Sequence, residues 1–326
     1  MSTEWQPTCS VELMRARAHM LRSIRNYFLE HSVLEVETPL LGRAIGTDPQ
    51  LAYFSTEFNW APQRQTLFLQ TSPEFAMKRL LAAGSGSIYQ IGKSFRNGES
   101  GRFHNPEFTL LEWYRVGFDL SRLMDDCEAL IQNLFKERRP LQATLRISYQ
   151  EVFQRHTGLN PLRFAYEDYC AYARDNALGE AVDICGHDHS LWLDFLFSHK
   201  VQPHLGKNAL CMVYGYPACQ SSLARLNEHK PQTTDRVELF IDGVELGNGY
   251  YELSHAEEQE RRFNEELTIR SERQLPAAVK DTRLIAALAA GLPDCSGMAI
   301  GLDRLLMVLL QKPSIDEVLC FPIDRA

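Results

Sequence analysis

The stretch Phe95–Phe108, with the sequence FRNGESGRFHNPEF, decides the fold because it is a dense polar loop between two strand-like runs. Residues 88–95 lead into this loop and residues 108–114 follow it, and both runs are rich in apolar and aromatic side chains. An arginine such as Arg96 can hold a phosphate through paired, charge-assisted hydrogen bonds. By itself the stretch predicts a hairpin that is either a nucleotide site or an ordinary charged surface loop.

The second strand of this hairpin should have one chemically mixed face. Side chains alternate between the two faces of a strand, so residues that are two apart project together. The residues on this face are Phe108, Leu110, Glu112 and Tyr114. The face therefore carries an aromatic ring that can stack on adenine, together with a carboxylate and a phenol.

A second hairpin is predicted within residues 237–253, VELFIDGVELGNGYYEL, because Asp242-Gly243 separates two runs of alternating apolar residues. In the implied register Glu238 and Glu245 project from one face as diagonal neighbours, roughly 7–8 Å apart. Two such carboxylates repel each other unless a positive charge lies between them, and Mg²⁺ carrying ATP phosphates is a candidate. A solvated strand face is the alternative.

The glycines of Gly247-Asn248-Gly249 interrupt the second strand of that hairpin. Such a pattern predicts a bulge or a close approach of backbones. Regular alternation would place Glu252 on the opposite face from Glu245, and a bulge could return it to the same face.

A third motif begins at Gly297 near the end of the sequence. An apolar helix is predicted over about Ala299 to Leu310, and the motif itself indicates that the chain becomes helical near Gly301. Arg304 falls in its first turn, where free backbone N–H groups and the helix dipole already favour an anion. A partly buried arginine paired with a carboxylate is the alternative interpretation.

The rest of the 326-residue chain indicates a single α+β domain over residues 1–326, with a mainly antiparallel sheet flanked by helices. A further strand is expected at residues 67–70, and helices are expected at residues 75–81, 120–135 and 255–273. The net charge of −8 argues against broad binding of nucleic acid. Eight scattered cysteines without a CxxC pair, no signal peptide and no long apolar run favour a cytoplasmic protein without a membrane span. The Cys185–His189 cluster is interpreted as a polar loop rather than a zinc site.

Three segments, taken in order, resemble the signature motifs of the catalytic domain of class II aminoacyl-tRNA synthetases. The first is a helix expected from Ser10 to about Glu30 with the strand that ends at Pro39. The others are Phe95–Phe108 and Gly297–Arg304. The resemblance implies ATP and Mg²⁺ as cofactors and a homodimer formed through the first segment.

Within that class, TSPE at Thr71–Glu74 and HNPEF at His104–Phe108 are similar to lysyl-tRNA synthetases. The implied ATP-binding residues are Arg96, Glu99, His104, Asn105, Phe108, Glu238, Glu245 and Arg304. Among these, Arg96 and Arg304 would be catalytic, and Glu238 and Glu245 would bind Mg²⁺. The implied substrate-binding residues are Ser72, Glu74, Glu112, Tyr114, Asn248, Glu252 and Ala299. Glu74 would meet the α- or β-amino group, while Glu112, Tyr114 and Glu252 would enclose the ε-ammonium.

Several features of the chain differ from lysyl-tRNA synthetases and resemble free-standing relatives of those enzymes instead. No room precedes Ser10 for an anticodon-binding OB-fold, and Ala299 stands where the synthetases usually have glycine. LEWYR at Leu111–Arg115 and PDCSG at Pro293–Gly297 resemble the ligases that join (R)-β-lysine, or lysine, to a lysine ε-amino group of elongation factor P. That resemblance implies an acceptor protein and no tRNA. A minimal lysyl-tRNA synthetase and a catalytically inactive regulatory paralogue are the alternatives.

One residue differs from the pattern of both the synthetases and the free-standing ligases. The second synthetase motif calls for glutamate at position 98, where this chain has Gly98 followed by Glu99. We therefore expect Glu99 or a backbone group to replace the usual adenine contact.

Overall fold

The computed structural model describes residues 5–326, which form two compact units. The first unit combines the residues up to Asp119 with Glu252–Ala326, and the second unit is Leu120–Tyr251. The expectation of one catalytic domain over residues 1–326 stays a prediction.

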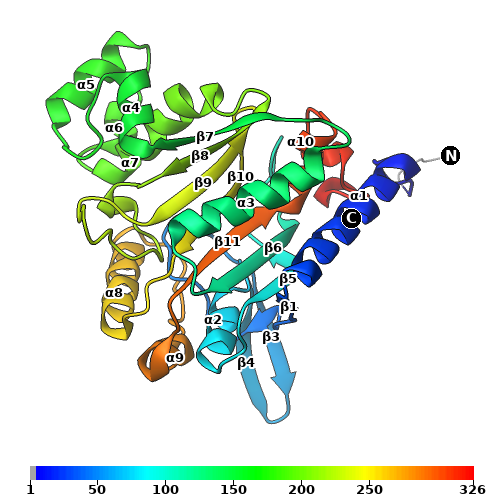
Figure 1. Ribbon diagram of the computed structural model, residues 1–326. Coiled ribbons are helices and arrows are strands. Elements are labelled where there is room, and N and C mark those ends of the chain that lie inside the picture. The colour runs from blue at the N-terminus through cyan, green and yellow to red at the C-terminus, as the bar shows by residue number, and fades with distance from the viewer. Residues whose placement is uncertain (1–4) are drawn as a thin grey trace. The chain divides into compact units, whose positions relative to one another are not determined.

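The first unit is built on four neighbouring strands in the order β1-β5-β6-β11 (Figure 1). Their bounds are β1 Leu34–Glu35, β5 Ile88–Phe95, β6 Glu107–Val116 and β11 Cys295–Gly301. The pairs β5–β6 and β6–β11 are antiparallel, and β1 runs parallel to β5. The central strand β6 is buried over most of its length, from Leu110 to Arg115. This strand therefore forms the centre of the first unit.

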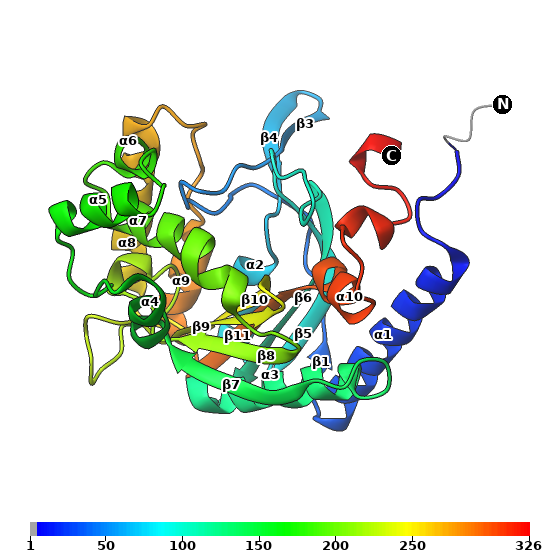
Figure 2. The same ribbon diagram turned by 90° about the horizontal axis from the view of Figure 1, so that it is seen from above.

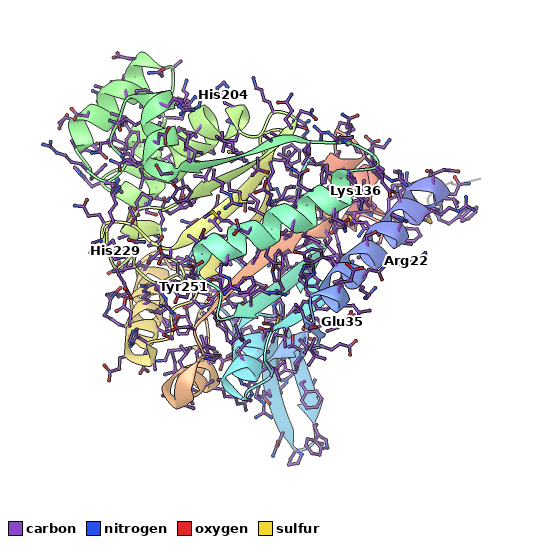
Figure 3. The ribbon with its side chains drawn as sticks, viewed as in Figure 1. Arg22, Glu35, Lys136, His204, His229 and Tyr251 are labelled. Atoms are coloured by element: carbon purple, nitrogen blue, oxygen red, sulfur yellow. The ribbon has the colours of Figure 1, made fainter. Side chains whose placement is uncertain are left out.

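Helix α1 (Val11–Glu30) forms as its sequence predicts. The Ser10 hydroxyl accepts a hydrogen bond from Leu13 N–H and thus caps the first turn. Apolar side chains at helical spacing, among them Met20 and Ile24, are buried. The polar face is exposed, and Figure 3 shows Arg22 on α1 and Glu35 on β1 pointing outward from this unit.

The C-terminal end of the chain lies beside the start of α1 (Figure 2). Thr8 N–H donates to Cys320 O at 2.9 Å, and the Thr8 hydroxyl donates to Leu319 O at 2.6 Å. Arg17 of α1 pairs with Asp303, which is 1% exposed. These contacts join the two ends of the sequence within the first unit.

The remaining elements of the first unit are a small sheet and four helices. The small sheet contains β2 (Leu41–Gly42), β4 (Gln63–Leu69) and β3 (Ser55–Trp60), in that order. The helices are α2 (Glu74–Ala82), α8 (Ala256–Glu272), α9 (Thr282–Gly291) and α10 (Leu302–Leu309). The expected strand at residues 67–70 is thus only the end of a longer hairpin strand.

The helix start predicted near Gly301 is confirmed, whereas the wider range from Ala299 was wrong at its start. Residues up to Gly301 belong to β11, which pairs with β6, and α10 begins only at Leu302. Ala299 and Ile300 lead directly into the leucine-rich helix, and a short apolar stretch does not by itself separate a buried strand from a buried helix. Arg304 nevertheless lies in the first turn of α10, as expected.

The second unit has four strands in the order β10-β9-β8-β7. They are β7 (Gln142–Ser148), β8 (Ala209–Tyr214), β9 (Arg236–Ile241) and β10 (Val244–Tyr251). Its helices are α3 (Leu120–Phe135), α4 (Tyr149–Thr157), α5 (Tyr166–Asp175), α6 (Ala181–Cys185) and α7 (His189–Leu196). Helices α4 to α7 gather at one end of the strands (Figures 1 and 2). Their aromatic core includes Tyr149, Phe153 and Trp192.

Pairing within the units is mainly antiparallel, with β1–β5 and β7–β8 as the parallel pairs among the described residues. Sheets flanked by helices confirm the predicted α+β class. Between residues 5 and 326, no helix is both long enough and apolar enough to cross a membrane.

Candidate active site

The mixed face of β6 forms as the alternation predicts. Glu112 and Tyr114 are 2% exposed each, and the Tyr114 hydroxyl donates to Glu112 Oε1 at 2.7 Å. Glu112 Oε2 is buried and has no hydrogen-bond partner among the described residues. A buried carboxylate oxygen in this state costs free energy, and a bound donor such as an ammonium group would satisfy it.

A buried ammonium lies between two further carboxylates. Lys78 Nζ is 2.6 Å from Glu74 Oε1, one turn earlier on α2, and 2.6 Å from Glu252 Oε2. Glu252 N–H donates to Cys295 O at 3.1 Å, which fixes this residue beside β11. Glu74 begins α2, where its backbone N–H donates to the Ser72 hydroxyl at 3.4 Å. The two carboxylates are thus positioned by a helix start and a strand end.

A glycine connects the two halves of this group. A Cβ built on Gly297 of β11 would lie 2.5 Å from Tyr114 Cδ1 and 2.7 Å from Glu252 Oε1. Both distances are shorter than real contacts, so only glycine lets Tyr114 and Glu252 lie against this strand. Two residues on, Ala299 pairs in register with Glu112. We call Glu74, Lys78, Glu112, Tyr114 and Glu252 the carboxylate cluster.

The electrostatics of the cluster explain the state of Glu112. Burial raises the pKa of Glu112 to about 8, and the negative charges of Glu74 and Glu252 act in the same direction. The hydrogen bond from Tyr114 and the charge of Lys78 act against this rise but are outweighed. Glu112 is therefore mostly protonated at neutral pH while no cation lies beside it.

The polar loop holds a second group of charged side chains. The Arg96 guanidinium lies over the Phe108 ring, 5.1 Å from its centroid, and Arg96 Nη1 is 3.6 Å from Glu99 Oε1. Arg96 Nε is buried and has no hydrogen-bond partner among the described residues. A donor in this state suits an anionic ligand such as a phosphate.

Arg304 reaches the same loop from α10. Its Nε donates to Phe103 O at 3.0 Å, and its Nη2 lies 2.5 Å from His104 Nε2. His104 Nε2 is in turn 4.0 Å from Glu99 Oε2. The two arginines are thus linked through Glu99 and His104. Gly98 has a φ of +79°, a left-handed conformation that would strain a glutamate at this position.

Two buried polar residues support this loop. Asp303 accepts a hydrogen bond from Thr109 N–H at 2.7 Å, which fixes α10 against the start of β6. The Asn105 side chain donates to Glu107 O at 2.6 Å and accepts from Ile323 N–H at 3.0 Å. The structure thus shows Asn105 engaged with the backbone, and its predicted contact with ATP stays a prediction.

The second unit contains the predicted carboxylate hairpin, with Glu245 opposite Phe240 and a register shift immediately after Glu245. Glu238 pairs in register with Asn248. Burial raises the pKa of Glu238 to about 7, and the nearby charge of Glu245 contributes to this rise. The Asp242-Gly243 turn and the bulge are therefore confirmed, and the two carboxylates do interact.

A positive charge that the sequence argument did not identify lies beside Glu238. Arg236 Nη2 is 2.5 Å from Glu238 Oε1, and Arg236 Nε donates to Asn248 Oδ1 at 3.2 Å. The Tyr216 hydroxyl donates to Glu238 Oε2 at 2.6 Å. The substrate role predicted for Asn248 and the Mg²⁺ role predicted for Glu238 and Glu245 stay predictions.

Lys78 is the residue of the first unit that sequence reasoning missed. The sequence does contain a pattern that could have identified Lys78. Residues 74, 77, 78 and 81 have the spacing of one helical face, at and just before the helix predicted at residues 75–81. Met77 and Leu81 are buried on this face, and a lysine among them must have a partner. Glu74, four residues earlier, is at the spacing of a helical ion pair.

Comparisons with known proteins agree with the fold. The family model of class II tRNA synthetases (D, K and N) matches residues 7–325, so the chain belongs to this family. Relatives named elongation factor P–(R)-β-lysine ligase align over its full length. The protein of Vibrio cholerae is 44% identical over 100% of this chain and 99% of its own. The protein of Vibrio parahaemolyticus is 45% identical over 100% of both chains. The protein of Yersinia enterocolitica is 42% identical over 100% of this chain and 99% of its own.

Proposed function

We propose that this protein activates (R)-β-lysine, or lysine, as an adenylate with ATP and then transfers it to a lysine ε-amino group of elongation factor P. The observation that carries the proposal is the buried, unpartnered Glu112 Oε2 within a cluster of three carboxylates. A buried carboxylate of this kind suits an ammonium group. Relatives that share the full length of the chain carry the corresponding name.

The first step joins the amino-acid carboxylate to the α-phosphorus of ATP and releases pyrophosphate. Arg96 has a buried Nε available for the α-phosphate, and Arg304 adds a second positive charge at the same loop. Fixed guanidinium groups favour this reaction because they are already oriented toward the charge that develops. Phe108 offers its ring to the adenine once the Arg96 side chain turns to a phosphate.

The second step is attack by the acceptor amine on the mixed anhydride, which releases AMP. The amine loses a proton as the amide bond forms. The residues of the cluster hold the acyl group during this step, with Glu74 at the amino group near the carbonyl. Glu112, Tyr114 and Glu252 then enclose the distal ammonium, which keeps the activated carbonyl in place for the acceptor.

Glu238 and Glu245 would hold Mg²⁺ in the second unit. Carboxylate oxygens suit a hard cation, and the negative charge of Glu245 helps to raise the pKa of Glu238, which a bound cation would lower again. Glu238 would then exchange its contacts with Arg236 and Tyr216 for the cation. When bound, Mg²⁺ would neutralise phosphate charge on ATP.

We also propose a cytoplasmic homodimer. All eight cysteines are free, as suits a reducing compartment. Exposed leucines follow α1 or lie at its end, which supports an interface formed by the first motif: Leu29, Leu34, Leu40 and Leu41. Sedimentation velocity would give a dimer, and a monomer at micromolar concentration would contradict this part.

The transfer is tested by incubating the protein with ATP, (R)-β-lysine and elongation factor P and then weighing the acceptor by mass spectrometry. We expect a gain of one lysyl unit that disappears without ATP. An elongation factor of unchanged mass, together with charging of lysine tRNA in a parallel reaction, would instead support the synthetase alternative.

A further inference from the structure

Lys78 is an ammonium enclosed within the carboxylate cluster. Its side chain is 1% exposed, and its Nζ contacts Glu74 and Glu252 at 2.6 Å each. Burial alone would lower the pKa of Lys78, but the charges and hydrogen bonds of Glu252 and Glu74 outweigh burial and raise it. Lys78 therefore remains charged throughout the working pH range.

The cluster contains unequal numbers of positive and negative groups. It has three carboxylates, those of Glu74, Glu112 and Glu252, and one ammonium, that of Lys78. When all are ionised, an excess of two negative charges remains. An acyl group with two ammonium groups neutralises this excess, whereas an acyl group with one does not.

We propose that Lys78 is a positioning and specificity-determining residue. It holds Glu74 and Glu252 as a fixed pair, and its charge sets the net charge of the cluster to match an acyl group with two ammonium groups. This inference rests on the proposed function, since lysine and β-lysine are both acids of this kind. Lys78 acts through its two carboxylate partners and does not need to touch the substrate.

The position of Lys78 on α2 makes the pairing rigid. Glu74 lies one helical turn before Lys78, so one ion pair is fixed by the helix itself. The second pair connects α2 to Glu252, which is tied to β11 through its backbone. Without the ammonium, Glu74 and Glu252 would be two like charges near each other at a buried position, and they would separate or take up protons.

The direct test replaces Lys78 and measures lysine-dependent pyrophosphate exchange. Lys78→Met should raise the KM for lysine at least tenfold, about 1.4 kcal/mol, while the KM for ATP changes less than about twofold. The conservative variant Lys78→Arg keeps the positive charge between Glu74 and Glu252 and should recover part of the lost affinity. A role in folding alone would raise both KM values alike and would give no recovery.

Lys280→Met is the matched control. Lys280 also pairs with a glutamate, Glu260 at 2.7 Å, but lies outside the cluster. Its replacement should leave the KM for lysine unchanged. If Lys78→Met has the same KM for lysine as this control, the inference is wrong and the proposed function stands. If the unaltered protein shows no exchange with lysine or β-lysine, the proposed function fails first.

A measurement on the unaltered protein covers the case in which Lys78→Met does not fold. Calorimetric titration would compare lysine with 6-aminohexanoate and norleucine, each of which lacks one of the two amino groups. We expect both to bind at least 100-fold more weakly than lysine. Equal binding of either compound would overturn the charge match that we assign to Lys78.

Discussion

Glu112 should release a proton when a lysine-like substrate binds beside it. The carboxyl has a pKa of about 8, raised chiefly by burial, so that about nine tenths of it is protonated at pH 7. The neutral form cannot pair with an ammonium group, whereas the ionised form can. Substrate binding therefore favours the ionised form, and affinity must rise as the pH increases toward the pKa of Glu112.

The size of the effect follows from the same pKa. Ionising Glu112 at pH 7 costs on the order of 1 kcal/mol, since its pKa of about 8 lies above this pH. The affinity for lysine should accordingly increase about tenfold per pH unit between pH 6 and pH 7 and become level above pH 8. At pH 7 each binding event should release most of one proton.

Calorimetric titration of lysine at pH 7 in buffers with different ionisation enthalpies measures this release directly. The observed heat should vary linearly with the ionisation enthalpy of the buffer, with a slope that approaches one proton. Glu112→Gln has no proton to release and should give a slope near zero with weaker binding. A slope near zero in the unaltered protein, or an affinity that is constant from pH 6 to pH 8, would show that Glu112 does not ionise when lysine binds.

Three substitutions test other parts of the site. Arg304→Ala should abolish pyrophosphate exchange while the thermal unfolding temperature changes little, and near-normal exchange would contradict its assigned role. Gly297→Ala places a methyl group against Tyr114 and Glu252. Overpacking of this kind should cost about 1–3 kcal/mol of lysine binding. An unchanged KM for lysine would show that Tyr114 and Glu252 do not lie so close to this strand. Ala299→Gly should shift the preference from β-lysine toward lysine, and an unchanged ratio of their kcat/KM values would remove Ala299 from the specificity argument.

Local patterns predicted the parts of the site that depend on one segment. Alternation along β6 placed Glu112 and Tyr114 on one face, and they form a hydrogen bond. The Asp242-Gly243 turn predicted the register of β9 and β10, because this turn type fixes how the flanking strands pair. Both predictions used only residues that are near each other in the sequence.

Contacts between distant segments could not be predicted in the same way. The Lys78–Glu252 ion pair joins residues far apart in the chain, and no spacing rule connects them. Arg236 was also missed, although it lies two residues before Glu238 on the same strand and hence on the same face. The error at Ala299 arose because Met298, Ala299 and Ile300 at the end of β11 are apolar like the helix that follows, so their side chains do not mark where the strand ends.

Substrate-dependent exchange of pyrophosphate into ATP reports activation at the carboxylate cluster without any acceptor. We expect rapid exchange with (R)-β-lysine, measurable exchange with lysine, and a loss of at least 100-fold when norleucine replaces lysine, since norleucine leaves the Glu112 carboxylate unpaired. Exchange with norleucine as fast as with lysine, or no exchange with either lysine or β-lysine, would show that the carboxylate cluster does not select an amino acid with two ammonium groups.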